Sequence, residues 1–122
     1  LGMQLLFHDS EEGSRAGLGW LEGKVVKFRF DQAPKPIPHM CWSEVTFRAN
    51  CGIVQNTAVK PRFYFVHSFH AVPKSEENII GTAQYGYEFC CAVKRGNIMG
   101  VQFHPEKSHR FGMELFNNFI KL

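Results

Sequence analysis

Apolar and polar residues alternate in several short runs of this chain, which is the pattern of half-buried β-strands. Residues 24–30 predict one such strand, in which Val26, Phe28 and Phe30 alternate with Lys27 and Arg29. A second run at residues 42–48 predicts another strand, which we expect to pair antiparallel with the first. Further strands are predicted over residues 62–68, 79–84, 87–94 and 97–103. Gly86 and residues 95–97 mark the turns between the last three strands.

Helical spacing of apolar residues occurs near both ends of the chain. Residues 1–8 predict a helix whose leucines face inward. Residues 108–122 predict a second helix, which Ser108 is placed to cap with its side chain. The inward stripe of that helix is expected to comprise Phe111, Leu115, Phe119 and Leu122.

Together these elements predict a single α/β unit over residues 1–122, with a mostly antiparallel or mixed sheet and a helix at each terminus. Loops are expected over residues 9–19 and 32–38, whereas residues 50–62 favour no element. A chain of 122 residues is long enough for one small hydrophobic core. Its contents of 44% hydrophobic and 20% charged residues are ordinary for a globular domain.

Charge and hydropathy exclude two classes of partner. The formal net charge of +3 comes from basic residues that are scattered singly rather than gathered into a stripe, which argues against nucleic acid. No apolar run approaches the length of a membrane span. We therefore expect a cytoplasmic protein that binds neither nucleic acid nor membranes.

The four cysteines of the chain show no C-x-x-C spacing. Cys90 and Cys91 are adjacent, and neighbouring residues of a strand point to opposite faces, so the two make poor partners for one metal ion. The six histidines show no metal-binding motif such as H-E-x-x-H. Buried free thiols, no metal site and no cofactor are the expectation.

One segment carries candidate chemistry. His104 and Glu106 follow an apolar, strand-like run and stand two positions apart, a spacing that puts both side chains on the same side of a strand. Pro105 between them fixes its own φ and has no N–H for sheet pairing. A carboxylate held beside an imidazole is the orienting half of a nucleophile–base–acid triad. Taken alone, His104 would more often be an ordinary surface or core histidine.

This segment resembles the His-Pro-Glu segment of class I glutamine amidotransferases, and is closest to that of the glutaminase subunits of imidazole glycerol phosphate synthase. Residues 10–13 resemble the S-x-E-G loop of that family. Residues 38–43 are similar to its P-H-M-G-W-N segment, from which Cys41 and Ser43 depart. Residues 64–69 are similar to Y-F-V-H-S-Y, with phenylalanine at the last position.

The resemblance runs along the whole chain but covers only the C-terminal part of the family's flavodoxin-like domain. Leu1 and Gly2 match the two residues that follow the nucleophilic cysteine in the family's G-x-C-x-G elbow. None of the four cysteines lies in such an elbow, so we expect these 122 residues by themselves to lack glutaminase activity.

The resemblance implies that His104 is the general base and Glu106 its orienting carboxylate. It assigns the side chains of Gln4 and Glu12, and backbone groups of Ser68 and Phe69, to the α-amino and α-carboxylate groups of glutamine. By default, Gln4 and Glu12 would be solvated polar residues. The backbone N–H of Leu1 would belong to the oxyanion hole.

The resemblance also implies a partner. Intact members of the family hydrolyse glutamine and pass ammonia to a (β/α)8-barrel synthase subunit, which makes imidazole glycerol phosphate in histidine biosynthesis. Trp42, Tyr64 and Lys107 would face that subunit, although the two aromatic residues are equally typical of a core. Two alternatives stay open: a glutaminase partner of a surface-polysaccharide sugar amidotransferase, and a non-catalytic remnant that self-associates as a homodimer or by domain swapping.

Overall fold

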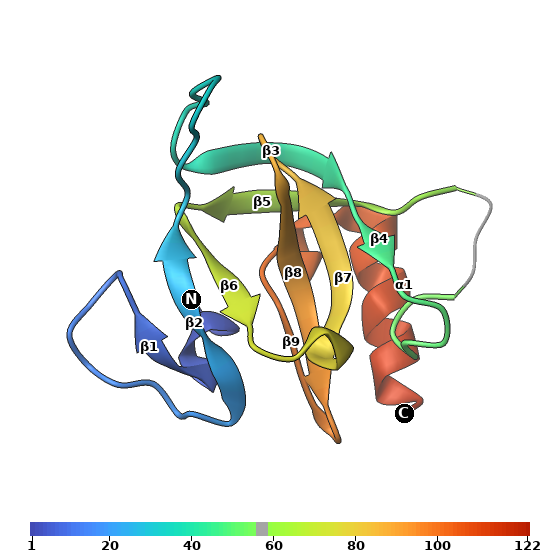
Figure 1. Cartoon of the computed structure of the whole chain (residues 1–122). Helices are drawn as coiled ribbons and strands as arrows, with labels where there is room; N and C mark the ends of the chain where they lie inside the picture. Colours follow the sequence, from blue (N-terminus) through green and yellow to red (C-terminus); the bar gives the residue numbers. More distant parts are fainter. Residues whose placement is uncertain (56–58) are drawn as a thin grey trace.

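Two β-sheets and one C-terminal helix form the structure (Figure 1). A computed structural model describes residues 1–55 and 59–122. The larger, seven-stranded sheet has the order β1-β2-β6-β8-β7-β4, with β9 paired to β8, and the smaller sheet is the pair β3-β5. The first five strands are β1 Phe7–Ser10, β2 Leu21–Lys27, β3 His39–Glu44, β4 Thr46–Phe47 and β5 Arg62–His67. The last four strands are β6 Phe69–Pro73, β7 Ile79–Gln84, β8 Glu88–Arg95 and β9 Ile98–Val101.

Three short 3₁₀ turns and one α-helix complete the chain. The turns are η1 Gln4–Leu6, η2 Glu76–Asn78 and η3 Pro105–Lys107, and the helix is α1 His109–Ile120. β1 and β2 pair in parallel, and the other strand pairs among the described residues are antiparallel. The predicted α/β unit with a mostly antiparallel sheet is confirmed, as are the strands around residues 62–68, 79–84, 87–94 and 97–103.

The N-terminal helix predicted over residues 1–8 is wrong in extent. Only the single turn η1 forms, and the chain enters β1 at Phe7. Phe7 is buried and β1 pairs with β2, so sheet hydrogen bonds take the backbone groups that a longer helix would use. Tertiary pairing has overridden the local apolar pattern here.

The partner predicted for the second strand is also wrong. β3 pairs with β5 in a register that places His39 opposite His67, whereas β2 pairs with β6. β6 begins at Phe69, directly after the single residue Ser68 that follows β5. The apolar pattern of residues 69–73 does not predict this strand. A chain that changes sheets across one residue lets β5 and β6 lie in different sheets, and Figure 1 shows β3 and β5 running across the ends of β7 and β8.

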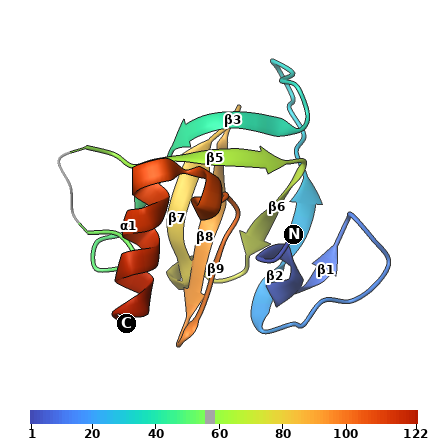
Figure 2. The same ribbon diagram turned by 180° about the vertical axis from the view of Figure 1, so that it is seen from behind.

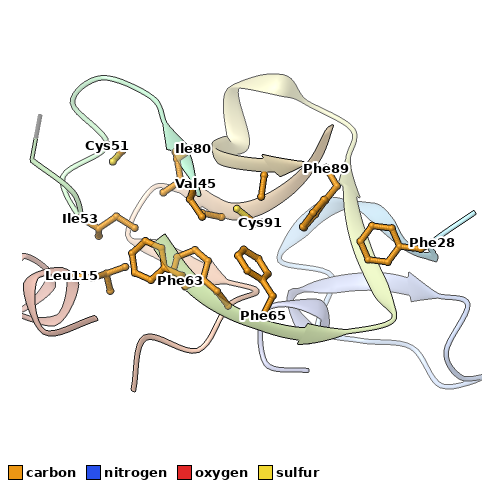
Figure 3. Close-up of a cluster of buried hydrophobic side chains, with 13 residues drawn as sticks. Phe28, Val45, Cys51, Ile53, Phe63, Phe65, Ile80, Phe89, Cys91 and Leu115 are labelled. Carbon is orange, nitrogen blue, oxygen red and sulfur yellow. The ribbon is translucent and has the colours of Figure 1, made fainter. Parts of the chain in front are cut away.

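The core consists of two clusters separated by β8. Cys91 lies in the larger cluster and Cys90 in the smaller one, so the two thiols do point to opposite faces. The larger cluster is aromatic: the rings of Phe63 and Phe103 stack with centroids 4.0 Å apart. Figure 3 shows the neighbouring rings of Phe65 and Phe89 gathered near Cys91. Burial of free thiols is confirmed for three cysteines and wrong for Cys41, which is exposed.

Helix α1 packs closely against the preceding turn η3 (Figure 2). Its buried residues are Gly112, Leu115 and Asn118, whereas Phe119 and Leu122 are exposed, so only part of the predicted stripe is correct. A Cβ atom at Gly112 would lie 1.8 Å from the carbonyl oxygen of Pro105, which explains the glycine. The Asn118 amide donates to the carbonyl of Ile53 at 3.2 Å and fastens the helix to the loop before β5.

Two histidines are buried side by side on the β3-β5 pair. His67 Nδ1 lies 2.8 Å from the carbonyl oxygen of Phe69, which can only accept, so Nδ1 carries the proton. His67 Nε2 then accepts from His39 Nδ1 at 3.0 Å, and His39 Nε2 accepts from the Ser43 hydroxyl at 3.0 Å. The contact between the two rings holds one shared proton, so charging both histidines would set two N–H groups against each other. Burial lowers the pKa of each histidine from 6.5 to about 4.

This pair predicts loss of stability in mild acid. Between pH 6.5 and pH 4 the unfolded chain binds protons at both histidines that the folded chain excludes, so the free energy of unfolding falls as pH falls. Each histidine contributes about 1.4 kcal/mol per pH unit within that window. In urea denaturation at several pH values, His39→Gln should lower the pH slope of the free energy of unfolding by the equivalent of about one bound proton. His8→Gln, at an exposed histidine, is the control, and equal pH slopes for the two variants would contradict the prediction.

Candidate active site

The turn η3 brings His104 and Glu106 together. An isolated antiparallel bridge holds His104 opposite Tyr64 on β5, and the His104 N–H donates to the Tyr64 carbonyl at 2.9 Å. Pro105 then starts η3, which folds the Glu106 carboxylate back over the ring, with Oε1 2.8 Å from His104 Nδ1. The predicted juxtaposition is present, but it arises from a 3₁₀ turn and not from the alternation of a strand.

Ser108 anchors the far side of this turn. The sequence predicts that the Ser108 side chain caps α1. The residue does stand at the N-cap position, but its side chain makes no capping hydrogen bond. Its hydroxyl instead donates to the His104 carbonyl at 2.6 Å and accepts the Tyr64 N–H at 3.1 Å. Ser108 is 0% exposed, so these two bonds fix the backbone of the His104 segment against β5 in a dry environment.

The carboxylate beside His104 is ionised at neutral pH. Partial desolvation raises the pKa of Glu106, but its own backbone N–H, the His104 hydrogen bond and the charges of His104 and Lys107 together outweigh that effect, so the pKa lies below its ordinary value. An ionised carboxylate accepts the proton of His104 Nδ1. In the neutral ring Nε2 then carries the lone pair, and the side chain is one-third exposed (33%). A base held in this tautomer can take a proton from a neighbouring nucleophile.

A cleft of about 330 Å³ lies at the end of β5, beyond the Tyr64 position that bridges to His104. Five of the residues expected to bind glutamine or its oxyanion contribute to the lining, namely Leu1, Gln4, Glu12, Ser68 and Phe69. Pro38, Val66 and His67 complete the lining. Val66 is two residues along β5 from Tyr64, the bridge partner of His104, a separation of about 7 Å in a strand. The structure thus collects the five predicted glutamine-binding and oxyanion residues around one small cavity, whereas His104 and Glu106 are not part of its lining.

Gln4 forms the buried floor of the cleft. Its amide nitrogen donates to the carbonyl oxygen of Phe69 at 3.2 Å and to Oε1 of Gln102 at 3.0 Å. Gln4 and Gln102 are only 7% and 5% exposed, so Gln4 is not the solvated residue that its polarity alone would suggest. The Phe69 carbonyl also accepts a hydrogen bond from His67, and these two hydrogen bonds fix the backbone at the cleft wall.

Sequence reasoning missed Gln102 and His67 as members of this site. Gln102 stands two positions before His104, and His67 lies inside the segment of residues 64–69, so both were within view. The bond between Gln4 and Gln102 joins positions 98 residues apart, so sequence spacing cannot reveal it. His67 and Phe69 are two residues apart, and that spacing does not by itself indicate a hydrogen bond. Only the three-dimensional arrangement shows them.

The three residues expected at a partner interface share one patch on the surface. The Trp42 ring lies 6.1 Å from that of Tyr64, and Lys107 Nζ lies 6.0 Å above the Tyr64 ring. Trp42 stacks on His109 with ring centroids 5.5 Å apart and remains 38% exposed, so it is not a core residue. We call Trp42, Tyr64, Lys107 and His109 the aromatic patch. The Tyr64 ring is 6.4 Å from that of His104, so the patch adjoins the base.

The thiols of the chain lie away from the cleft. None of the four cysteines, all within the described residues, contributes to its lining. Burial raises the pKa of Cys90 to about 12 and that of Cys91 well above its ordinary value, which leaves both unreactive. Across residues 1–55 and 59–122, no group of three His, Cys, Asp or Glu side chains is arranged to hold a metal ion. No helix in the same ranges is long and apolar enough to cross a membrane.

Comparison with known proteins identifies the family. The chain is 47% identical over its whole length to the imidazole glycerol phosphate synthase subunit HisH of Leptospira interrogans, covering 61% of that protein. It is 50% identical over 99% of its length to the HisH 2 subunit of Methanococcus maripaludis, covering 59%, and 45% identical to the HisH 2 subunit of Pseudomonas aeruginosa, covering 60%. The chain thus spans about 60% of the length of these relatives. Residues 1–122 match the family described as glutamine amidotransferase class-I, and with the imidazole–carboxylate pair beside the cleft this match shows that the chain belongs to that family.

Proposed function

We propose that these residues form the glutamine-binding and base-carrying part of a glutaminase centre, which serves imidazole glycerol phosphate synthase in histidine biosynthesis. The observation that carries this proposal is the 2.8 Å contact between His104 Nδ1 and the Glu106 carboxylate, beside a cleft lined by Gln4 and Glu12. The names of the HisH relatives favour this synthase, rather than a sugar amidotransferase, as the enzyme that uses the ammonia.

The chemistry of the cleft fits the head group of glutamine. The Glu12 carboxylate supplies a counter-charge for the α-ammonium group, and the carbonyl of Gln4 supplies a hydrogen-bond acceptor. In hydrolysis, a cysteine thiolate attacks the carboxamide carbon, and His104 takes the thiol proton and returns it to the departing ammonia. Leu1 at the cleft contributes a backbone N–H to the developing oxyanion. Because no cysteine lines the cleft in the described structure, these residues alone bind glutamine without hydrolysing it.

The aromatic patch is the docking surface that we propose for a (β/α)8-barrel synthase subunit. Trp42 and Tyr64 offer flat apolar area, and Lys107 holds one positive charge over the Tyr64 ring. Aromatic anchors with a peripheral charge are typical of the centre of an interface. The patch touches the His104 ring through Tyr64, so a docked partner would lie next to the base.

Self-association remains a separate prediction. The outer face of α1 exposes Met113, Phe116 and Ile120 at helical spacing, and Leu122 follows them. Apolar surface of this kind favours contact with another chain. A homodimer or swapped dimer would cover that face without involving the cleft.

Glutamine binding is the first test. L-glutamine titrated into the chain should shift the NMR signals of Gln4, Glu12 and Phe69, and Glu12→Gln should weaken binding about 3- to 10-fold, because it removes one partly exposed counter-charge. Glu22→Gln makes the same change on an exposed carboxylate outside the cleft and should have no effect. Absence of glutamine-dependent shifts in the wild-type chain would overturn the proposed function.

The tautomer of His104 is the second test. At a pH where the ring is neutral, ¹⁵N chemical shifts should place the proton of wild-type His104 on Nδ1. Glu106→Ala should move most of the proton population to Nε2, because the carboxylate that holds Nδ1–H is gone. Asp9→Ala removes the matching carboxylate of the exposed His8–Asp9 pair and should leave His104 unchanged. A wild-type proton on Nε2 would contradict the assigned base.

Docking of the barrel subunit is the third test. Lys107→Glu should weaken binding of that subunit at least about 10-fold, because a rim charge is reversed next to the aromatic anchors. Lys121→Glu makes the same change beyond the end of α1 and is the control. Affinity measured by fluorescence titration should separate the two variants. Equal affinities would remove the aromatic patch from the interface.

A further inference from the structure

The hydrogen bonds of Gln4 determine which end of its amide faces the cleft. Phe69 presents a backbone carbonyl, which can only accept, so the group 3.2 Å from it must be the NH₂ of Gln4. That NH₂ also faces a side-chain oxygen of Gln102 at 3.0 Å. Both amide protons are therefore engaged, and the Gln4 carbonyl oxygen is the group left for a ligand.

We propose that Gln102 is a positioning residue that selects ligands with an α-amino group by locking the Gln4 amide. This inference rests on the proposed function and deepens it. Gln102 does not line the cleft, so it acts through Gln4 and does not touch the ligand. The α-ammonium of an amino acid donates to a carbonyl oxygen, whereas an NH₂ group in the same place would repel it.

Two acceptors make the lock stronger than either one alone. The Phe69 carbonyl already accepts from His67 at 2.8 Å, so its bond to Gln4 at 3.2 Å is the longer of the two that it receives. The Gln102 bond is shorter, at 3.0 Å, and is buried. A buried hydrogen bond is costly to leave unmade, because the freed N–H has no water to replace its partner. Without Gln102, only the longer bond to the Phe69 carbonyl opposes rotation of the Gln4 amide, and that rotation would present NH₂ to the ligand.

The placement of Gln102 also couples ligand selection to the base. Gln102 and His104 belong to the short segment after β9. The Gln102 N–H donates to the Cys91 carbonyl at 2.8 Å, and the His104 N–H donates to the Tyr64 carbonyl at 2.9 Å. The same stretch of backbone therefore sets the position of the general base and the orientation of the amide that reads the α-amino group.

The test compares two ligands in three forms of the full chain. L-glutamine and glutaramate, which is glutamine without its α-amino group, are each titrated by NMR into wild type, Gln102→Met and Gln102→Glu. Met preserves the length of the side chain but removes the acceptor, whereas Glu keeps an acceptor. We expect the ratio of affinities for L-glutamine over glutaramate to fall about 3- to 10-fold in Gln102→Met, which is the worth of one buried hydrogen bond. Gln102→Glu should keep the wild-type ratio.

The ratio separates positioning from general damage, because a loosened cleft weakens both ligands together. An unchanged ratio in Gln102→Met, with wild-type preference for L-glutamine intact, would overturn this inference alone. A wild-type chain that binds neither ligand, or both equally, would overturn the proposed function as well. If the variants fail to fold, hydrogen exchange of the wild-type Gln4 side chain decides: two protected amide protons support the lock, and one freely exchanging proton overturns it.

Discussion

The attachment of residues 102–108 to β5 is the constraint on which the site depends. The backbone bridge between His104 and Tyr64, the buried hydroxyl of Ser108 and the stacked rings of Phe63 and Phe103 all act across this seam. The bridge and the hydroxyl fix the base, and the stacked rings fix the core beneath it. β5 also supplies Val66 and His67 to the cleft. The same strand therefore holds the backbone of the base in position and forms part of the wall of the binding cavity.

Buried polar groups concentrate at the same place. His39, His67 and Gln102 are nearly inaccessible to solvent, yet each finds a partner, and among the described residues no buried side-chain nitrogen or oxygen lacks one. Such networks are stable only when every member is satisfied, so they specify a single arrangement more sharply than apolar packing does. Here the network runs through the carbonyl of Phe69, which joins the histidine pair to the Gln4 amide and so to Gln102.

The apolar pattern located four strands closely, although only β5 buries one face in regular alternation. β7 appears over Ile79–Gln84 with the predicted bounds, and β5, β8 and β9 lie within a few residues of them. The pattern failed where long-range pairing decided the outcome. Residues 1–8 have a helical spacing of apolar residues, but the chain pairs with β2 from Phe7 onward. β6 escaped prediction because only Ser68 separates it from β5, and a continuous apolar run does not reveal a change of sheet.

The site divides in the same way. The His104–Glu106 pair and the members of the cleft came from short motifs whose residues are close in sequence or match a family segment. The roles of Gln102, His67 and Ser108 depend on contacts between distant segments, and polar residue types carry no mark of the partner that they will meet. Spacing and the family resemblance together therefore indicate the reacting groups, but not the residues that hold them in place.

Gly112 illustrates how closely the helix and the turn are fitted. Alanine is usually favoured over glycine inside a helix by about 1 kcal/mol, so a routine effort to raise thermal stability would choose this position. The carbonyl of Pro105 occupies the space that the added methyl group would need. The next residue after that carbonyl is Glu106, so the methyl group would push on the peptide that aims the carboxylate. A substitution chosen to stabilise the helix at Gly112 would thus disturb the alignment of the Glu106 carboxylate with the His104 imidazole.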